Sequence, residues 1–388
     1  MHSIKRHLFI LETEVSQAAF ADALPTTLKL DFQPTSEYEH QFFDTFDWRL
    51  YDAELILERF LDSLQLSNST SGILLEKWEL AGKPVSRFAW ELPDRHMQHI
   101  LGPILGERAL MPVVSSTRRI TPIDVKNSDG KTVVRLQWHE YRIQDQDDEV
   151  HLISLSSIRG YDAEAAIVHQ ALESIGAHNN FHDPLFILAP KVGRKPLDYS
   201  SRLELHLTPE MSLIEACQKI FQQLLSAMLQ NHAGMRDDID TEFLHDYRVA
   251  IRRTRSALSL IKGIFQREVR KNWQTQFSYL GKMTNRLRDL DVYLLSENQY
   301  RDMLPLGLQN GLNDLFTYLA IERKKEFTKF NAQLKKKEIH TIQAEWQLFI
   351  DDLTSESAPL GKNAQENVFT TSQKLIFDTF RIVAEMDR

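Results

Sequence analysis

A run of cationic side chains at helical spacing lies near the middle of the chain. Its members, spaced i, i+3, i+7 and i+10, are His245, Arg248, Arg252 and Arg255. On a helix that turns about 100° per residue, these side chains fall within roughly 80° of one another. Arginine can grip phosphate oxygens through paired, charge-assisted hydrogen bonds, and the stripe would extend about 15 Å along a helix. The spacing therefore predicts a site for an anion with several successive phosphates.

The same segment carries an apolar stripe whose centre lies about a quarter-turn from the cationic one. It consists of Leu244, Tyr247, Ile251, Leu258 and Ile261. The cations should therefore border the protein core. A solvated helix face usually mixes charge signs, but residues 245–295 hold 11 Lys and Arg against 4 Asp and Glu, in a chain of net charge −8. This imbalance favours a ligand site, and a plain solvated face is the alternative.

A second helix, expected from Trp273 to about Leu295, adds three cations ahead of Asp289 and Asp291. Arg288 lies one turn from Asp291, so an ion pair between these two is an alternative to ligand binding. The complete set of candidate binding residues is His245, Arg248, Arg252, Arg253, Arg255, Lys262, Lys282, Arg286 and Arg288.

Two motifs in this region resemble those of a known family. The sequence HDYRVAIRRTRSAL at 245–258, followed by NRLRDLDVYL at 285–294, resembles the histidine-containing α-helical domain family, CHAD. The resemblance implies paired antiparallel helical bundles with a basic surface. It also implies that the ligand is inorganic polyphosphate and that the protein associates with polyphosphate granules.

The family pattern has a second half with another His-x-x-Arg helix. No such motif follows Arg248 in this chain, which ends at Arg388. Either the chain is truncated or the helical domain is incomplete by design, and in both cases we expect the second half of the bundle to be missing. Apolar faces on the last helices would then lack partners, and this favours a homodimer or poor solubility.

Composition narrows the class of protein. The chain has 388 residues, of which 42% are hydrophobic and 26% are charged, and this length suggests two or three domains. No apolar run approaches the roughly 20 residues of a membrane span, so we expect a cytoplasmic protein without membrane partners. The single cysteine, Cys217, excludes an internal disulfide or a cysteine metal cluster, and we expect it on a buried helix face. Neither a metal site nor a cofactor motif is found.

The first half of the chain reads as β-rich. Alternation of apolar and polar residues predicts strands at 38–44, 54–60, 72–79, 85–91, 132–143 and 149–158, with Asp129-Gly130 as a hairpin turn. A helix is expected from Glu164 to Ile175. Residues 1–176 are thus predicted to form a curved antiparallel sheet or barrel.

The segment FFDTFDWRLY at 42–51 resembles the signature of the CYTH, or triphosphate tunnel, family, and the resemblance implies a β-barrel phosphohydrolase. That family opens with Glu-x-Glu-x-Lys, but this chain has Ser3-Ile-Lys5-Arg-His7, and an alignment on Glu12 and Glu14 places Ser16 where lysine belongs. The family's later Arg-x-Arg is replaced by residues 58–60, which read Glu-Arg-Phe. A site without chelating carboxylates holds Mg²⁺ poorly. The domain is therefore expected to be CYTH-like in fold and non-catalytic.

The second half reads as helical. After a linker at 177–203, helices are expected at 210–233, 241–264, 268–299, 305–337, 340–354 and 365–386, with Thr208-Pro209-Glu210 as the first helix start. A second cationic run, which begins at Arg323, mixes its signs and is interpreted as a solvated face. The predicted fold class is α+β: a β-barrel-like domain at 1–176, then an all-α antiparallel bundle at 204–388.

Three functions fit these observations. Polyphosphate binding by the basic helix stripe is the first, without enzymatic activity. A triphosphatase in the N-terminal tunnel is the alternative, weakened by its missing motif residues. Nucleic-acid binding is the second alternative, although the chain is acidic overall and the stripe lacks interleaved aromatic side chains for base stacking.

Overall fold

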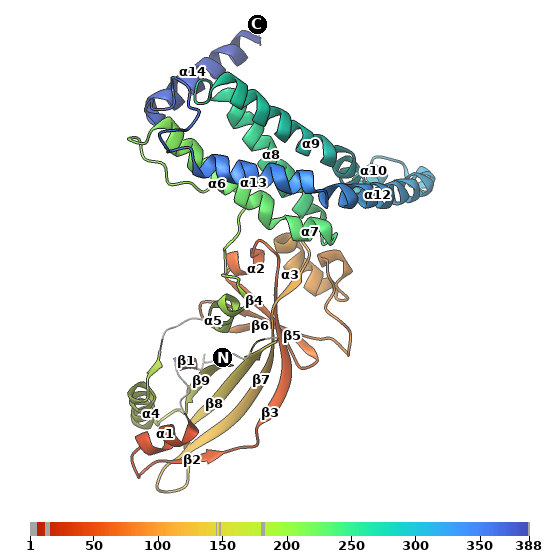
Figure 1. The fold of residues 1–388 in the computed structure, drawn as a ribbon. Helices are drawn as coiled ribbons and strands as arrows, with labels where there is room; N and C mark the ends of the chain where they lie inside the picture. Colours follow the sequence, from red (N-terminus) through yellow and green to blue (C-terminus); the bar gives the residue numbers. More distant parts are fainter. Residues whose placement is uncertain (1–5, 12–15, 145, 147–148, 180–182, 387–388) are drawn as a thin grey trace. The chain divides into compact units, whose positions relative to one another are not determined.

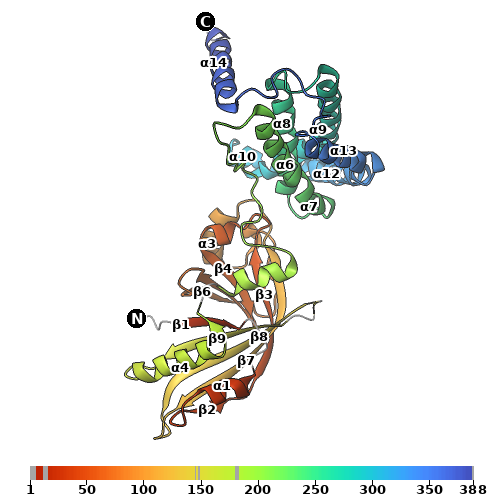
Figure 2. The ribbon, with the colours of Figure 1, turned by 60° about the vertical axis from the view of Figure 1, so that its left-hand side comes forward.

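The chain forms two compact units, Met1–Tyr199 and Ser200–Arg388. The computed structural model describes residues 6–11, 16–144, 146, 149–179 and 183–386 (Figures 1 and 2). The first unit is dominated by an antiparallel sheet and the second is helical. The predicted α+β class, with the sheet before the helices, is confirmed.

Ten antiparallel strands form one strongly curved sheet in the first unit (Figure 1). Its path runs β10-β1-β9-β8-β7-β3-β4-β5-β6, and β2 pairs with β7 beside this path. Among the described residues the two ends of the path are not paired, so the sheet is barrel-like but open. The strands are β1 (Arg6–Leu11), β2 (Lys29–Phe32), β3 (Ser36–Asp44), β4 (Leu55–Phe60), β5 (Ser63–Asn68), β6 (Leu74–Glu79), β7 (Met111–Lys126), β8 (Thr132–Ile143), β9 (Glu149–Ser157) and β10 (Ala177–His178).

Most of the predicted strands are present, and one is wrong. The hairpin turn between β7 and β8 contains Gly130 at a φ of 74°, as the Asp-Gly signal indicates. Residues 85–91 contain a 3-10 turn, Ala89–Glu91, in place of a strand. In this turn the Phe88 and Trp90 rings stack, and the Glu91 carboxylate accepts a hydrogen bond from the Phe88 N–H.

Both faces of the sheet are covered along part of their length. Helices α1 (Gln17–Ala23) and α4 (Asp162–Ser174) pack on a core that contains Phe20, Trp138 and Leu172. A separate core under β3–β6 is closed by α3 (Arg95–Leu105), and α2 (Arg49–Asp52) lies between β3 and β4.

The opposite face of the sheet is covered by a short helix, α5 (Pro184–Leu188), followed by the 3-10 turn η2 (Ala189–Val192). Leu185 and Leu188 are fully buried there against Phe42 and Leu152. The predicted linker at 177–203 is therefore not a connector over most of its length. The first unit ends at Tyr199, not at residue 176, because this helix completes its core.

The second unit is a bundle of helices that follow the predicted segments closely. Their bounds are α6 (Leu213–Gln230), α7 (His232–Arg236), α8 (Thr241–Leu260), α9 (Arg267–Leu295), α10 (Glu297–Asp302), α11 (Leu306–Gln309), α12 (Asn313–Leu334), α13 (Lys337–Asp351) and α14 (Val368–Met386), with the 3-10 turn η3 (Asn310–Leu312) before α12. The predicted start at Thr208-Pro209-Glu210 is wrong. Ser212 caps α6 and forms a capping box with Glu215, which satisfies the first backbone N–H groups.

The core of the bundle is aromatic. Trp346 of α13 contacts Phe221 of α6 and both Trp273 and Phe277 of α9, with ring centroids 4.7–5.0 Å apart. Tyr247 of α8 is fully buried, as its place in the apolar stripe predicts. Cys217 is also buried, and this burial raises the pKa of its thiol to about 12. The thiol is therefore protonated and poorly reactive at neutral pH.

One cation of the predicted solvated run has a structural role. Arg323 of α12 donates hydrogen bonds to Asp238 and to the buried Asp291 of α9, at 2.6–2.8 Å. The neighbouring pairs Lys325–Glu322 and Lys329–Glu326 are exposed, as expected. The suggested pair between Arg288 and Asp291 is thus replaced by one with Arg323.

Two surface properties of the helices bear on the predicted surroundings of the protein. Of the helices in the described parts of the chain, none combines the length and apolar character needed to cross a membrane. Helix α14 exposes Ile376, Phe377 and Phe380, each by at least 65%. Its apolar face is compatible with the predicted homodimer, which stays a prediction.

Candidate functional site

A cationic groove lies between α8 and α9. Its volume of about 350 Å³ falls in the range of ligand-binding clefts. The lining contains four arginines and one histidine and, among the described residues, no carboxylate. The residues are His245, Arg248, Val249, Ile251, Arg252, Arg255, Gly281, Asn285, Arg288 and Val292.

Helix α8 presents this stripe because both its start and its apolar face are fixed. The Asp240 carboxylate caps it by accepting hydrogen bonds from the N–H groups of Glu242 and Phe243. Tyr247 and Ile251 are buried in the bundle. The stripe at 245, 248, 252 and 255 therefore lies at the edge of the core, beside α9.

Helices α8 and α9 run antiparallel, as two contacts at opposite ends of the pair show. Near the end of α9, Arg288 donates to the carbonyl of Thr241 at the start of α8. Near its beginning, Gln274 donates to the carbonyl of Leu258 at the end of α8. The groove thus has one long wall from each helix.

Arg248 clamps the two walls together. Its Nη1 donates to the carbonyl oxygen of Gly281 at 3.3 Å, to Asn285 Oδ1 at 2.8 Å and to Thr284 Oγ1. Burial lowers its pKa from the ordinary arginine value, but the group stays charged at neutral pH. Arg248 therefore lines the groove with its Nη1 engaged in joining the two helices, whereas its Nε and Nη2 make no hydrogen bond to another described residue.

Arg252 and Arg255 are in the opposite situation. Both are exposed, and within the described parts of the chain neither makes a hydrogen bond or an ion pair with another side chain. Arg288 is partly engaged, because it donates to the carbonyl of Thr241 and lies 4.0 Å from the Glu242 carboxylate. The two exposed arginines are the groove's available cations.

His245 is the titratable group of the groove. Burial lowers its pKa below the ordinary histidine value, and the charges of Arg288 and Arg252 lower it further. Glu242 and Asp246 act in the other direction with smaller combined effect. The imidazole is therefore neutral at physiological pH in the unliganded groove.

Four of the predicted binding residues lie outside the groove lining. Arg253 donates to the carbonyl oxygen of Ser201 at 2.6 Å. Arg286 lies near Glu322 of α12, whose pKa is lowered by a hydrogen bond from Lys325 and, to a smaller extent, by the charge of Arg286. Lys282 and Lys262 are exposed and do not line the groove. Of the nine predicted binding residues, the structure therefore brings five together in the groove: His245, Arg248, Arg252, Arg255 and Arg288.

The sequence reading missed the α9 wall, formed by Gly281, Asn285 and Val292. These positions lie on the same helical face as Arg288, at spacings of three, four and seven residues. The helical spacing of these positions can be seen in the sequence. Glycine, asparagine and valine are uncharged, however, so their residue types did not indicate anion binding.

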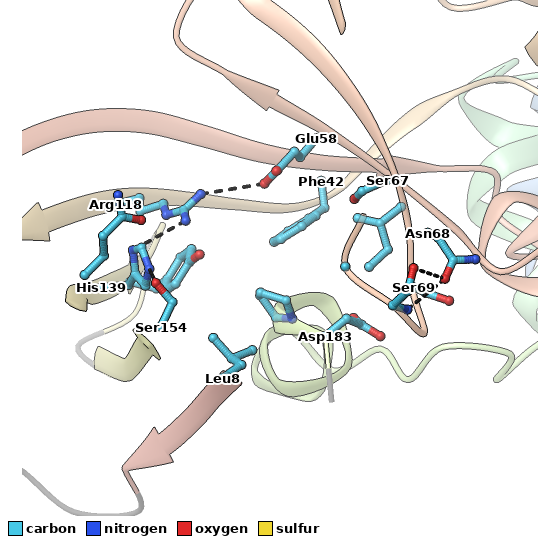
Figure 3. Close-up of a pocket in the computed structure, with 16 residues that line it drawn as sticks. Leu8, Phe42, Glu58, Ser67, Asn68, Ser69, Arg118, His139, Ser154 and Asp183 are labelled. Atoms are coloured by element: carbon cyan, nitrogen blue, oxygen red, sulfur yellow. Dashed lines mark hydrogen bonds and ion pairs between the residues drawn. The ribbon is translucent and has the colours of Figure 1, made fainter. Parts of the chain in front are cut away.

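The first unit contains a second cavity, of about 170 Å³ (Figure 3). Figure 3 shows Arg118, His139 and Ser154 on one side, the loop with Asn68 and Ser69 on the other, and Phe42 between them. Its lining is Leu8, Phe42, Ile56, Glu58, Ser67, Asn68, Ser69, Ser71, Gly72, Arg118, Gln137, His139, Tyr141, Ser154, Asp183 and Pro184.

If the first unit hydrolysed triphosphate, as the resemblance to the tunnel family implies, this cavity would be the candidate site. Glu58, which replaces an arginine of the family motif, lines it, and Phe60 stacks on Arg118. The motif positions Ser3, Lys5, Glu12 and Glu14 lie outside the described residues. Within the described ranges, no group of three or more His, Cys, Asp or Glu side chains is placed to hold a metal ion.

The fold and the groove together define an α+β chain whose helical unit carries a cationic groove between two antiparallel helices. Residues 219–385 match the family model described as CHAD domain, so the helical unit carries a CHAD domain. No curated protein matches the chain.

Two solved structures resemble part of the chain. A candidate adenylate cyclase from Bacillus halodurans is 11% identical, with 47% of this chain and 94% of that chain covered and a TM-score of 0.30. A conserved hypothetical protein from Pyrococcus furiosus is also 11% identical, with 46% and 95% covered and a TM-score of 0.23. Likenesses of this size say nothing about activity or substrate.

Proposed function

We propose that the groove between α8 and α9 binds inorganic polyphosphate. The observation that carries this proposal is the position of Arg252 and Arg255, two exposed guanidinium groups without a partner among the described residues, in a groove whose lining holds no acid. Cations gathered in this way repel one another until an anion neutralises them. The CHAD domain at 219–385 supports the same ligand class.

The shape of the groove favours a linear polyanion. From His245 to Arg255 the cationic wall extends about 15 Å at 1.5 Å per residue, so successive phosphates can meet successive arginines. The uncharged lining consists of Val249, Ile251, Gly281, Asn285 and Val292. The groove lining holds no Phe, Tyr or Trp, and His245 is its one aromatic ring, so stacking of successive nucleic-acid bases lacks a platform. Binding to the polymer would place the protein on polyphosphate granules in the cytoplasm.

The test compares two double variants that remove the same charge from the same pair of helices. Arg252→Ala with Arg255→Ala removes two of the four arginines that line the groove, whereas Lys282→Ala with Arg286→Ala removes two cations of α9 outside it. Each charge-assisted contact is worth about 1.5–3 kcal/mol, so the groove variant should bind polyphosphate about a hundredfold or more weakly. The readout is a titration at several salt concentrations, with circular dichroism as the folding control.

The salt dependence separates site binding from general attraction. Each neutralised phosphate releases condensed counterions, so the groove variant should also show a flatter slope of affinity against salt. The Lys282/Arg286 variant should keep most of the affinity. Equal losses in the two variants would mean that the surface attracts polyanions diffusely and that the groove is not the site. A single-stranded nucleic acid that binds as tightly as polyphosphate would favour the nucleic-acid alternative.

A triphosphatase in the first unit is the second candidate function, and the cavity in Figure 3 supports it poorly. Among the residues that line it, Arg118 is the only arginine or lysine, whereas Glu58 and Asp183 are both carboxylates. A triphosphate needs several cations or a bound metal to offset its charge. We therefore propose that the protein is not a triphosphatase.

A further inference from the structure

The cationic groove ends before the two helices that form it. Its lining stops at Arg255 on α8 and at Gly281 on α9. Helix α8 continues beyond that point to Leu260, and the antiparallel α9 begins alongside it at Arg267. The same pair of helices therefore offers further surface in line with the groove.

The pairing of α8 with α9 fixes which residues face one another past the end of the groove. Gln274 Nε2 of α9 donates to the carbonyl oxygen of Leu258 of α8 at 3.3 Å. In an antiparallel pair, the next turn along one helix lies across from the preceding turn of the other. Lys262, four residues after Leu258, therefore lies across from Arg270 and Lys271, which precede Gln274 by one turn.

The connection between α13 and α14 adds another cation at this place. The Gly361 N–H donates to the carbonyl oxygen of Ile264 at 2.6 Å, and Asn363 Nδ2 donates to the carbonyl oxygen of Lys262 at 3.1 Å. Lys362 stands between these two bonded residues, so its backbone is held beside Lys262. The four cations form what we call the distal cluster: Lys262, Arg270, Lys271 and Lys362.

The charges of the distal cluster are available to a ligand. Its three lysines are exposed, and none makes an ion pair or a side-chain hydrogen bond with another described residue. Arg270 is half-buried, and its Nε has no hydrogen-bond partner in the described ranges. Glu268, the acid in the first turn of α9, lies about 120° around the helix from Gln274 and so faces away from α8. The cluster thus repeats the property on which the groove proposal depends.

The groove and the distal cluster are in line and are separated by uncharged polar side chains. The cationic wall of the groove, from His245 to Arg255, takes about 15 Å, and α8 continues to about 22 Å at Leu260. Ser259 and Gln274, which are 3.2 Å apart, occupy the interval. A molecule that contacts both cationic sites must therefore be long and must carry negative charge along its length.

We infer, on the basis of the proposed function, that the protein selects long polyphosphate chains. Triphosphate is shorter than the groove and fills part of it. A longer chain leaves the groove over Gln274 and continues to the distal cluster. Once the groove holds one part of the polymer, contact with the cluster is intramolecular, and such linkage can raise affinity by a factor on the order of 10².

The test is a titration of the full chain with polyphosphates of defined and increasing length, starting from triphosphate. It is run at about 0.15 M salt, where charges more than about 8 Å apart are largely screened. Lys262→Ala with Lys271→Ala should bind triphosphate within about twofold of wild type, because triphosphate does not reach these lysines. The same variant should bind long chains about tenfold or more weakly, and its affinity should fall less steeply with salt.

Two controls accompany this variant. Lys282→Ala with Arg286→Ala removes the same charge from outside both sites and should follow wild type at every chain length. Every variant shares the statistical advantage of longer chains, so the comparison between variants isolates the distal contacts. Lys362→Ala, in the connection before α14, is a second and milder variant that should weaken long-chain binding about threefold. Circular dichroism checks that each variant is folded.

This inference and the groove proposal fail in different ways. If Arg252→Ala with Arg255→Ala lost triphosphate binding while the two distal variants bound long chains as wild type does, the groove would be the whole site and the inference would be wrong. Equal losses in the distal and Lys282/Arg286 variants would also overturn it, because the long-chain effect would then be general attraction. If the groove variant instead bound every chain length like wild type, both proposals would fall.

Discussion

At the scale of single residues, arginines of the same helix have different tasks. Arg252 and Arg255 are available for a ligand, Arg248 joins α8 to α9, and Arg253 is bonded to the backbone carbonyl of Ser201. The spacing predicted which face the first three share. It did not predict their tasks, because the partner of Arg248, Asn285, lies 37 residues away in the sequence.

The histidine of the groove leads to a pH prediction. Bound phosphate oxygens should raise the pKa of His245, which burial, Arg288 and Arg252 keep low in the free groove. The bound state then takes up a proton, so this contribution to affinity is fully present below the free-state pKa and is lost as pH rises through the bound-state pKa. Polyphosphate should therefore bind more tightly at about pH 5 than at about pH 8.

Replacement of the imidazole should remove that dependence. His245→Gln should bind at similar strength across this range, whereas His206→Gln, which changes an exposed histidine outside the groove, should behave as wild type. Calorimetric titration in two buffers of different ionisation enthalpy counts the protons directly. A wild-type protein that takes up no proton on binding would show that His245 does not contact the anion.

At the scale of elements, the helices were predictable and the longest strand was not. Strand β7, at the centre of the sheet, contains Pro112 and Pro122, and proline within a run argues against a strand. The sheet tolerates Pro122 in a register opposite Gln137 of β8. The predicted bounds of the helices lie within a few residues of the observed ones, because the apolar period of 3.6 repeats over many turns. The exact first residue of a helix depends on a single capping side chain, such as Ser212 for α6.

The approach of α7 to α8 depends on one glycine. A Cβ at Gly234 would collide with the ring of Phe243, which is buried in the first turn of α8. Gly234→Ala should therefore lower the free energy of unfolding by about 1–3 kcal/mol, since the ring must move in a packed core. Gly311→Ala is the control, because a Cβ there meets no atom within 4 Å. Urea denaturation measures both, and equal stability of the two variants would contradict the packing described for α7.

At the scale of the whole molecule, the chain is two units with cores of their own. The change from period-two to helical patterning predicted this division but placed the boundary too early. Asp183-Pro184 is the start signal of a helix, with the carboxylate as cap and proline in the first turn, and α5 begins there. Its short length hid it among prolines and glycines, although Leu185 and Leu188 belong to the first core.

Separate cores predict separate responses to ligands. A ligand that binds only folded protein stabilises the unit that contains its site, by an amount that grows with the logarithm of its concentration. Calorimetric unfolding of the full chain should show two transitions, and polyphosphate should raise the midpoint of one of them. Arg252→Ala with Arg255→Ala should abolish that shift, and polyphosphate should leave the midpoint of the other transition unchanged. Assignment is direct, because Gly234→Ala should lower the midpoint of the transition that polyphosphate raises. If instead the full chain unfolded in one transition, which polyphosphate raised and Gly234→Ala lowered, the two units would unfold as one, and the division at Tyr199 would have no thermodynamic meaning.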